Sequence, residues 1–299
     1  NIFIIQTYYN TKIAKSIYLK MNNDFLNIGD LLMESLKKYD KIVICMEGCV
    51  MAIQLIYFSG TGSTQKVVRF IGKQWQEKVY EYDLSNPHIA RHVFSHQDLC
   101  IVGVPSYGGR VPTIAIERLK QFKANQTPVI LVVTYGNRHY DDTFIELKDT
   151  LQPLGFICVG AMAIVCEHSI VHEFAHGRPN AKDFEYIQSL VETLKSDLHP
   201  IEVPGHRPYK IFRGGLKPLV TSQCTKCGLC AKLCPVEAID LQHLETTNES
   251  LCISCMRCIS ICPFKARICD DKQVEATRMK IQKVCTIDKQ SELIGGSLC

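Results

Sequence analysis

Five apolar runs divide the middle of the chain, and polar stretches with helix-like spacing separate them. The runs lie at 53–58, 79–83, 99–104, 128–134 and 156–165, the second being the weakest. They lack polar–apolar alternation, which is typical of strands buried on both faces of a parallel sheet. The stretches at 63–75, 112–122, 142–151 and 181–198 have the spacing of amphipathic helices. The pattern predicts an open α/β domain over residues 51–197, with a five-stranded parallel sheet covered by helices.

Residues 1–50 show no comparable pattern. The chain begins at Asn1, and Met51 stands directly before the first apolar run. We therefore expect residues 1–50 to be a leader or a mis-extended start. A helical appendage is the alternative, because helix-like spacing connects five apolar residues: Phe25, Ile28, Leu31, Leu32 and Leu36.

The chain after residue 197 changes in character. Residues 198–220 contain proline and glycine without sustained periodicity, which predicts a linker. A small second domain is expected over 221–270. Residues 271–299 then form a C-terminal tail, with a helix expected at 272–284.

The second domain contains two copies of one cysteine pattern. Each copy reads C-x2-C-x2-C-x3-C-P, which is the spacing of bacterial two-cluster ferredoxins, where the fourth cysteine of each run binds the other run's cluster. Zinc knuckles would use separated C-x2-C pairs, and a disulfide framework needs an oxidising compartment. One [4Fe-4S] cluster is thus assigned to Cys224, Cys227, Cys230 and Cys262. The second is assigned to Cys252, Cys255, Cys258 and Cys234.

The length and the cysteine content limit the number of domains and the roles left for the other cysteines. The length of 299 residues suits two domains. The clusters would use eight of the 16 cysteines; of the other eight, Cys100, Cys158 and Cys166 lie in apolar runs and are expected to be buried rather than reactive.

Eight thiolates and two oxidised cluster cores would bring the formal charge of +4 close to zero, which removes the argument that a basic charge favours nucleic-acid binding. The apolar run 155–166 is too short to span a membrane, and no signal peptide is evident, so a cytoplasmic location is expected.

The first apolar run ends in a loop suited to a phosphate. Residues 58–64 read FSGTGST and lead directly into a helix, whose N-terminal amides and dipole favour an anion. A Walker A loop lacks its GKS/T end here, and a Rossmann loop would need glycine where Gln65 stands. The S/T-x-T-G-x-T loop of flavodoxins matches at Ser59, Thr61, Gly62 and Thr64.

Two further loops follow the third and fourth apolar runs. They read PSYGGRVP at 105–112 and TYGNRHY at 134–140, and both combine an aromatic residue with glycine. Such loops at the carboxyl ends of parallel strands can sandwich a flat ring while backbone amides reach its polar edge.

Residues 53–197 therefore resemble the flavodoxin fold. The whole region 53–270 looks like a bacterial fusion family in which a flavodoxin-like FMN domain precedes a small α+β two-cluster ferredoxin domain. The resemblance implies FMN, with its phosphate on 59–64, its ring between the other two loops, and Gly108 turning its peptide toward flavin N5. The implied FMN residues are Ser59, Gly60, Thr61, Gly62, Ser63, Thr64, Pro105, Ser106, Tyr107, Gly108, Gly109, Thr134, Tyr135, Gly136, Asn137 and Tyr140.

Residues 172–176 spell H-E-x-x-H, the motif of zinc metalloproteases. That motif functions inside a long helix that is followed by a third ligand. Here Gly177 and Pro179 break any helix directly after the second histidine, and Glu192 is only a nominal third ligand. The motif is thus expected to be a connection between the last strand and the last helix of the domain.

Two functions fit this combination of cofactors. The preferred one is an electron carrier that exchanges electrons with redox proteins such as ferredoxin-dependent or flavodoxin-dependent enzymes, with no catalytic residue of its own. The alternative is an FMN-dependent oxidoreductase whose clusters deliver electrons for reduction of a small molecule. A redox sensor would need a DNA-binding element, which is not recognisable. If clusters and flavin lie too far apart within one chain, they must meet through a partner or in a homodimer.

Overall fold

The computed structural model describes residues 18–21, 24–27, 52–212 and 214–294. By its contacts the chain divides into two compact units, residues 1–45 and 46–299. The described part of the first unit is a hairpin in which β1 (Tyr18–Met21) pairs antiparallel with β2 (Asp24–Asn27). Phe25 thus lies in a strand rather than in the helix considered from its spacing; the other four residues of that pattern, and the expected start at Met51, lie outside the described residues.

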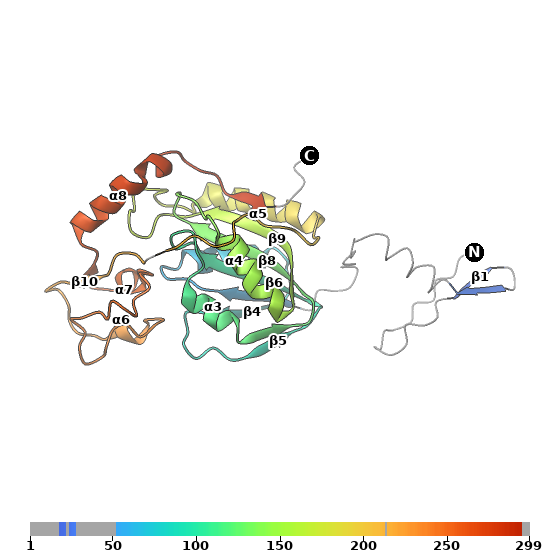
Figure 1. The fold of residues 1–299 in the computed structure, drawn as a ribbon, viewed down its shortest axis with the longest axis horizontal. Helices are drawn as coiled ribbons and strands as arrows, with labels where there is room; N and C mark the ends of the chain where they lie inside the picture. The colour runs from blue at the N-terminus through green and yellow to red at the C-terminus, as the bar shows by residue number, and fades with distance from the viewer. Residues whose placement is uncertain (1–17, 22–23, 28–51, 213, 295–299) are drawn as a thin grey trace. The chain divides into compact units, whose positions relative to one another are not determined.

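The second unit is built on a mostly parallel sheet (Figure 1). Its parallel strands are β3 (Ala52–Tyr57), β4 (Val79–Asp83), β6 (Asp98–Pro105), β8 (Thr127–Tyr135) and β9 (Phe156–Val165). They lie in the order β4-β3-β6-β8-β9, which is the flavodoxin order 2-1-3-4-5. The chain reverses direction across the sheet between β3 and β6, and this switch point is where such sheets bind ligands.

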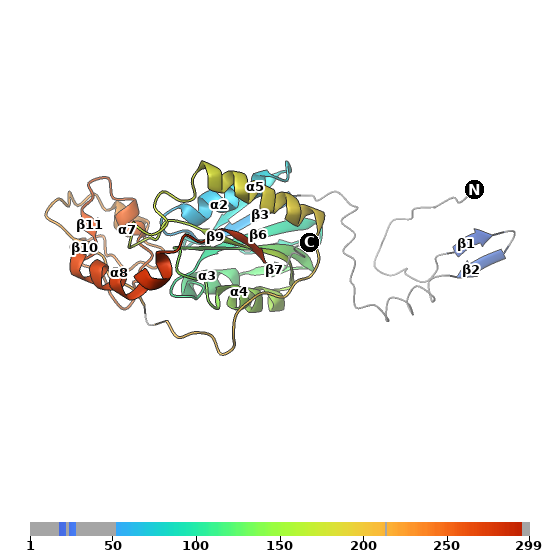
Figure 2. The same cartoon turned by 90° about the horizontal axis from the view of Figure 1, so that it is seen from above.

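Helices cover both faces of this sheet, as the lack of polar residues in its strands requires. They are α2 (Ser63–Lys73), α3 (Thr113–Leu119), α4 (Thr143–Leu151) and α5 (Ala181–Ser196). Figure 2 shows α2 and α5 on one face and α3 and α4 on the other. All nine residues of β8 are buried between the two layers.

All five predicted strands and all four predicted helices are confirmed, with ends shifted by a few residues. The structure adds a small parallel pair, β5 (His92–Phe94) and β7 (Phe122–Ala124), so the predicted helix 112–122 ends earlier than expected. The sheet itself has six strands rather than five, because β12 (Glu292–Ile294) pairs antiparallel with β9. A strand of three residues is too short to show a periodic pattern in the sequence, so β12 could not be predicted.

The cysteine-rich region follows a segment whose described residues form no regular element between α5 and residue 219. It contains the short helices α6 (Leu229–Lys232) and α7 (Arg257–Ser260) and the strand pair β10 (Leu219–Val220) and β11 (Arg267–Ile268). The expected tail helix is confirmed as α8 (Asp271–Cys285). The tail is more than an appendage, because α8 leads back to β12 on the main sheet (Figure 1).

Candidate functional site

The eight cysteines of the repeated pattern gather in two groups of four, each lining its own cavity. The two cavities have empty volumes of about 350 and 340 Å³. The first is lined by Cys224, Cys227, Cys230 and Cys262, and the second by Cys234, Cys252, Cys255 and Cys258. The fourth cysteine of each run therefore lies with the first three of the other run, as the crossed assignment requires.

This arrangement suits a cluster better than a single metal ion. Among the residues that the structure describes, no three His, Cys, Asp or Glu side chains converge closely enough to hold one ion. A cubane instead needs four thiolates spread around a wider space. The donors and the cavities thus fit two [4Fe-4S] clusters.

The two cysteine runs repeat their backbone conformation as well as their sequence. The helix of each run begins after a residue with left-handed backbone, Gly228 at φ 76° and Met256 at φ 58°, which stand 28 positions apart. Each fourth cysteine accepts a backbone hydrogen bond on Sγ, from Ala238 to Cys234 and from Ala266 to Cys262, both at 3.3 Å. Burial raises the pKa of Cys262, but such amide donors outweigh it and hold the pKa below its ordinary value, which favours the thiolate.

The first loop, residues 59–64, lies at the switch point between β3 and α2. Gly62 takes φ 95°, and α2 begins without a side-chain cap, which leaves its first amides directed at the loop. The Ser59 hydroxyl accepts from the Gln65 amide at 3.2 Å, and Thr64 bonds Thr134 at 2.7 Å between their hydroxyls. This contact joins the first loop to the end of β8.

The second loop, residues 105–112, turns through Gly108 and Gly109. Tyr107 and Arg110 exchange two backbone hydrogen bonds of 3.0 and 3.2 Å, and the glycines between them have φ of 61° and 90°. Two positive φ angles in succession define a type I′ turn, which explains the paired glycines. The Tyr107 ring meets Phe58 edge-on at 6.4 Å, and desolvation raises the pKa of Tyr107 well above its ordinary value.

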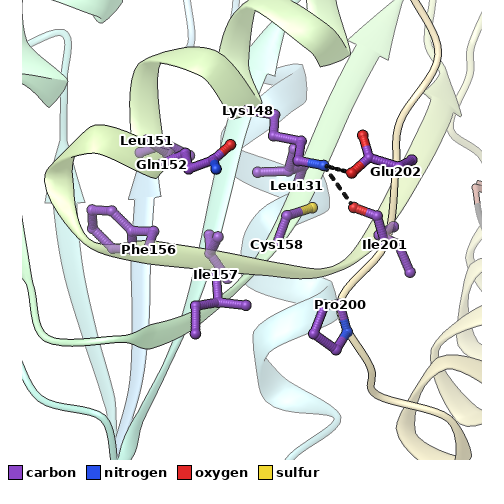
Figure 3. A pocket seen from close by; sticks show the side chains of 11 residues that line it. Leu131, Lys148, Leu151, Gln152, Phe156, Ile157, Cys158, Pro200, Ile201 and Glu202 are labelled. Carbon is purple, nitrogen blue, oxygen red and sulfur yellow. Dashed lines mark hydrogen bonds and ion pairs between the residues drawn. The ribbon is translucent and has the colours of Figure 1, made fainter. Parts of the chain in front are cut away.

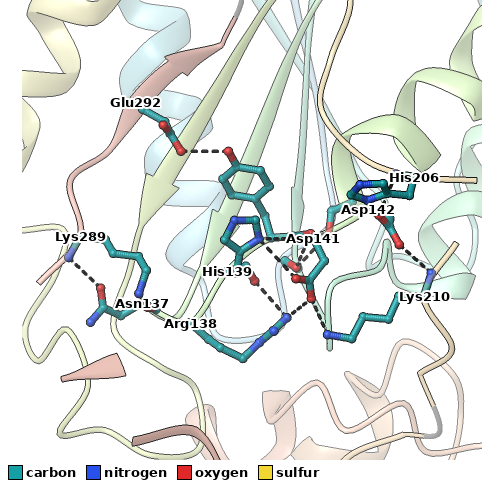
Figure 4. Close-up of polar contacts among 12 residues, drawn as sticks. Asn137, Arg138, His139, Asp141, Asp142, His206, Lys210, Lys289 and Glu292 are labelled. Carbon is teal, nitrogen blue, oxygen red and sulfur yellow. Dashed lines mark hydrogen bonds and ion pairs between the residues drawn. The ribbon is translucent and has the colours of Figure 1, made fainter. Parts of the chain in front are cut away.

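The aromatic residues of the third loop, residues 134–140, lie in the core. Tyr135 and Tyr140 are buried and meet edge-on at 5.5 Å. The Tyr140 hydroxyl donates to a carboxylate oxygen of Glu292 in β12 at 3.0 Å (Figure 4). Burial raises the pKa of Tyr135 to about 12. The side chains of both tyrosines thus pack against each other and β12.

Asn137 is fully buried and also serves the C-terminal segment. Its amide nitrogen donates to the carbonyls of Cys285 at 2.6 Å and Ile287 at 3.0 Å, and its oxygen accepts from the Lys289 amide at 3.0 Å. Figure 4 shows Lys289 beside it. The structure therefore brings Ser59, Gly60, Thr64, Tyr107 and Thr134 together at the switch point, while it directs the Asn137 side chain to residues 285–289.

Hydrogen bonds join the linker to Asp142, two residues after the third loop. The buried Asp142 accepts from the backbone amides of His206 at 2.9 Å and Lys210 at 2.6 Å (Figure 4). Desolvation raises the pKa of Asp142, but these donors hold it below its ordinary value. Phe212 then lies directly against Gly108, where an added Cβ would be 2.0 Å from its ring. Phe212 could not be predicted as a contact of this loop, because the linker sequence shows no periodicity.

His168 packs over the third loop, where its side chain lies 2.6 Å from the position of a Cβ on Gly136. Its Nδ1 accepts from the amides of Ile170 at 3.2 Å and Val171 at 3.0 Å, so the ring is neutral with its proton on Nε2. Desolvation, aided by the charges of His172 and Arg138, lowers the pKa of His168 from 6.5 to about 4.

Because the pKa of His168 is lowered in the folded protein, we expect the protein to lose stability in acid. The unfolded chain takes up the proton near pH 6.5 and the folded chain only near pH 4, so stability falls with pH across that range. From pH 7 to pH 5 the loss from His168 is expected to be about 2 kcal/mol. Urea unfolding of the native protein and of His168→Asn, whose oxygen can replace Nδ1 as acceptor, checks this at both pH values. Equal pH dependence in the two proteins would contradict it.

The H-E-x-x-H residues form turns rather than a helix, as the glycine and proline after them predict. His172 lies 2.7 Å from one carboxylate oxygen of Glu167, and His176 lies 3.2 Å from the other. The segment thus connects β9 to α5, with its histidines directed at a carboxylate.

A separate cavity with an empty volume of about 740 Å³ lies between α4, the first halves of β8 and β9, and residues 200–202 (Figure 3). Among the described residues that line it, Lys148 is the one cation; it pairs with Glu202 at 2.7 Å and also donates to the Ile201 carbonyl at 2.9 Å. The cavity lies toward the amino ends of the strands. Sheets of this kind bind ligands at the opposite, carboxyl ends, so this cavity is not the candidate site.

None of the helices in the described part of the chain is both long enough and apolar enough to cross a membrane.

Comparison with known proteins supports the cysteine-rich part. Residues 223–266 match the family model described as 4Fe-4S dicluster domain, which confirms the prediction of a dicluster region. No curated protein matches the chain.

The solved structures that resemble this chain include flavodoxins. The FMN-bound flavodoxin of Fusobacterium nucleatum is 16% identical over 49% of this chain and 98% of its own, with a TM-score of 0.34. Oxidised flavodoxin 2 of Bacillus cereus is 14% identical over 48% and 98%, with a TM-score of 0.36. Rubredoxin oxygen:oxidoreductase of Desulfovibrio gigas is 14% identical, with a TM-score of 0.34. The match covers 56% of this chain and 41% of that protein, so this chain spans less than half of its length. The flavodoxin-like fold is assigned here from the strand order itself.

Proposed function

We propose that this protein is an iron–sulfur flavoprotein that passes single electrons between two [4Fe-4S] clusters, FMN and external redox partners in the cytoplasm. One observation carries the proposal: a single compact unit contains two four-cysteine cavities and, at the switch point of a flavodoxin-like sheet, a loop suited to a phosphate. Fixing donor and acceptor in one chain gives a high effective concentration and removes the need for a diffusional encounter.

The protein residues would bind, orient and shield the cofactors. The two sets of cysteines would hold the clusters, and amide donors such as Ala266 stabilise their sulfurs. The first loop would hold the flavin phosphate on the amides of Ser63 and Thr64 at the start of α2, and the second and third loops would shape the ring site. When bound, FMN supplies the capacity to exchange electrons one or two at a time. Cys255 and Met256 are buried, which keeps water from one side of their cluster cavity.

Anaerobic reconstitution of the full chain tests the proposal. We expect about eight iron and eight sulfide per chain, as two [4Fe-4S] clusters require, together with one FMN. Gly62→Val is the matched variant for the flavin. Gly62 has φ 95°, where a β-branched residue is strained, and nothing lies within 4 Å of an added Cβ, so the change acts on loop conformation alone. This variant should keep its iron and lose FMN.

The donor separates the carrier from the oxidoreductase. We expect a reduced one-electron carrier protein to reduce the bound flavin, and NADH or NADPH to do so slowly or not at all. Rapid turnover with a nicotinamide alone would favour the alternative, an FMN-dependent oxidoreductase. Reconstituted protein without flavin absorbance would contradict the FMN assignment, and protein without iron would contradict the clusters.

A further inference from the structure

The first loop is in direct contact with one of the two cysteine cavities. An added Cβ on Gly60 would lie 2.2 Å from the carbonyl oxygen of Cys255, so only glycine allows this approach. Arg257 donates from Nη1 to the carbonyl of Ser59 at 3.1 Å. Cys255 is itself buried and packs with the core of the flavodoxin-like domain. The loop suited to the flavin phosphate therefore touches the Cys252–Cys258 run.

A second connection reaches the other cysteine-bearing segment that lines the same cavity. Arg118 on α3 is buried and donates at 2.6 Å to the carbonyl of Leu84 and at 2.6 Å to that of Pro235. Pro235 directly follows Cys234, which is the fourth cysteine of this cavity. Both cysteine-bearing segments that line the Cys234/Cys252/Cys255/Cys258 cavity, here called the inner cavity, are thus bonded to the flavodoxin-like domain.

The cavity of Cys224, Cys227, Cys230 and Cys262, here called the outer cavity, has no such attachment. Within the described part of the chain, no hydrogen bond joins residues 224–230 or Cys262 to residues 52–197. Cys227 is exposed, whereas Cys255, its counterpart 28 residues later, is buried. The counterpart of Arg257 in this run is Leu229, which cannot make the contact to Ser59.

Arg257 belongs to both sites at once. It lines the inner cavity, and its guanidinium bonds the carbonyl that opens the first loop. Its Nε is buried and has no hydrogen-bond partner among the described residues, so one donor remains available on the side chain. A buried unpaired donor is costly unless a partner is present, and a sulfur of the cluster in the cavity that Arg257 lines would be one.

We propose that the two clusters work in a fixed order, with the inner cluster exchanging electrons with the flavin and the outer cluster exchanging them with external one-electron carriers. Arg257 is the positioning residue that joins the inner cluster to the first loop. In the reducing direction, one electron leaves an external carrier, which is oxidised, and enters the outer cluster. It then passes to the inner cluster and to the flavin, and both clusters return to their oxidised state. The inference rests on the function proposed above.

Arg257→Gln tests this order, with Lys232→Gln as its control. Lys232 is exposed on α6, the helix that matches α7 in the repeat, so both changes remove one positive charge beside a cluster. Iron and FMN should stay unchanged in both variants. After flash reduction of the clusters, electron arrival at the flavin should slow roughly 10–100-fold in Arg257→Gln, the range typical for residues that support metal ligands, and remain unchanged in Lys232→Gln.

A redox titration followed by electron paramagnetic resonance gives a second readout. Loss of the Arg257 charge should make the inner cluster harder to reduce and leave the outer cluster unaffected. Native rates and potentials in Arg257→Gln, or an equal slowing in Lys232→Gln, would overturn the order. If Arg257→Gln fails to assemble, Arg118→Gln removes the second attachment of the inner cavity, outside the first loop, and should slow the same step. Absent iron or FMN in the native protein would instead refute the proposed function.

Discussion

Cys234→Ala is expected to lower the iron content from about eight to about four per chain, because the cluster held by Cys252, Cys255 and Cys258 loses its fourth ligand. The residue to be removed belongs to the first cysteine run, yet its side chain lines the cavity of the second. Another thiol, Cys269, lies 3.5 Å from the Met256 sulfur but does not line the cavity, so the same iron content is expected in Cys234→Ala combined with Cys269→Ala. The cluster of Cys224, Cys227 and Cys230 should survive with its own signal.

Double variants make this expectation specific to the crossed arrangement. Cys234→Ala combined with Cys258→Ala should lose no more iron than either change alone, since both belong to one cavity. Cys262→Ala combined with Cys258→Ala should lose both clusters, because the two residues line different cavities. Iron and sulfide analysis of anaerobically reconstituted protein checks both. The reverse pattern would show that each run binds its cluster with its own four cysteines.

Losing clusters should also cost structure in this region. Its own apolar core consists of Ala231, Ile239 and Leu244, packed against two cysteines. So small a core cannot offset the conformational entropy of about fifty residues, and small domains of this kind depend on bound metal for their folding. Protein without clusters should therefore be cut by protease between residues 221 and 270, while the sheet domain persists.

The sheet was predictable because its strands are buried on both faces. Runs such as 128–134 and 156–165 contain almost no polar residue, and no other common element has that pattern at that length. β12 was not predictable, since three residues carry no period and its pairing with β9 depends on the path of α8. The same holds for β5 and β7, which are equally short.

The candidate site also has a part that could be predicted from the sequence and a part that could not. Cysteine spacing is a local pattern, so both four-cysteine sets followed from the sequence. Contacts between distant residues did not: the bond from Arg257 to Ser59 joins positions 198 residues apart, and Leu229 at the repeated position shows that the repeat does not require it. The loop positions were predicted from the ends of strands, but which side chains face the switch point depends on what packs behind them.

Asn137 was predicted to lie near the flavin, but its side chain contacts residues 285–289 instead. Replacing it is expected to have the largest effect on stability. In Asn137→Ala, the carbonyls of Cys285 and Ile287 and the amide of Lys289 lose their side-chain partner. The bond to Cys285 is buried, so its loss costs about 1–3 kcal/mol, whereas water can replace the partner of the exposed Ile287 and of the part-buried Lys289 amide. The backbone of Asn137 is also left-handed at φ 59°, which costs alanine about 1 kcal/mol more. We expect the free energy of unfolding to fall by about 2–4 kcal/mol in total.

Asn137→Gly separates the two causes, because glycine accepts the left-handed backbone and lacks the side chain. It should recover about 1 kcal/mol relative to alanine and remain far less stable than the native protein in urea unfolding. Hydrogen exchange locates the effect: amides of β12 should exchange faster in both variants, while those of β3 should open only with the whole domain. Native exchange in β12 would mean that its pairing with β9 holds the C-terminal segment without Asn137. In that case the returning chain is fastened by the sheet, and the third loop is free to adapt to the flavin.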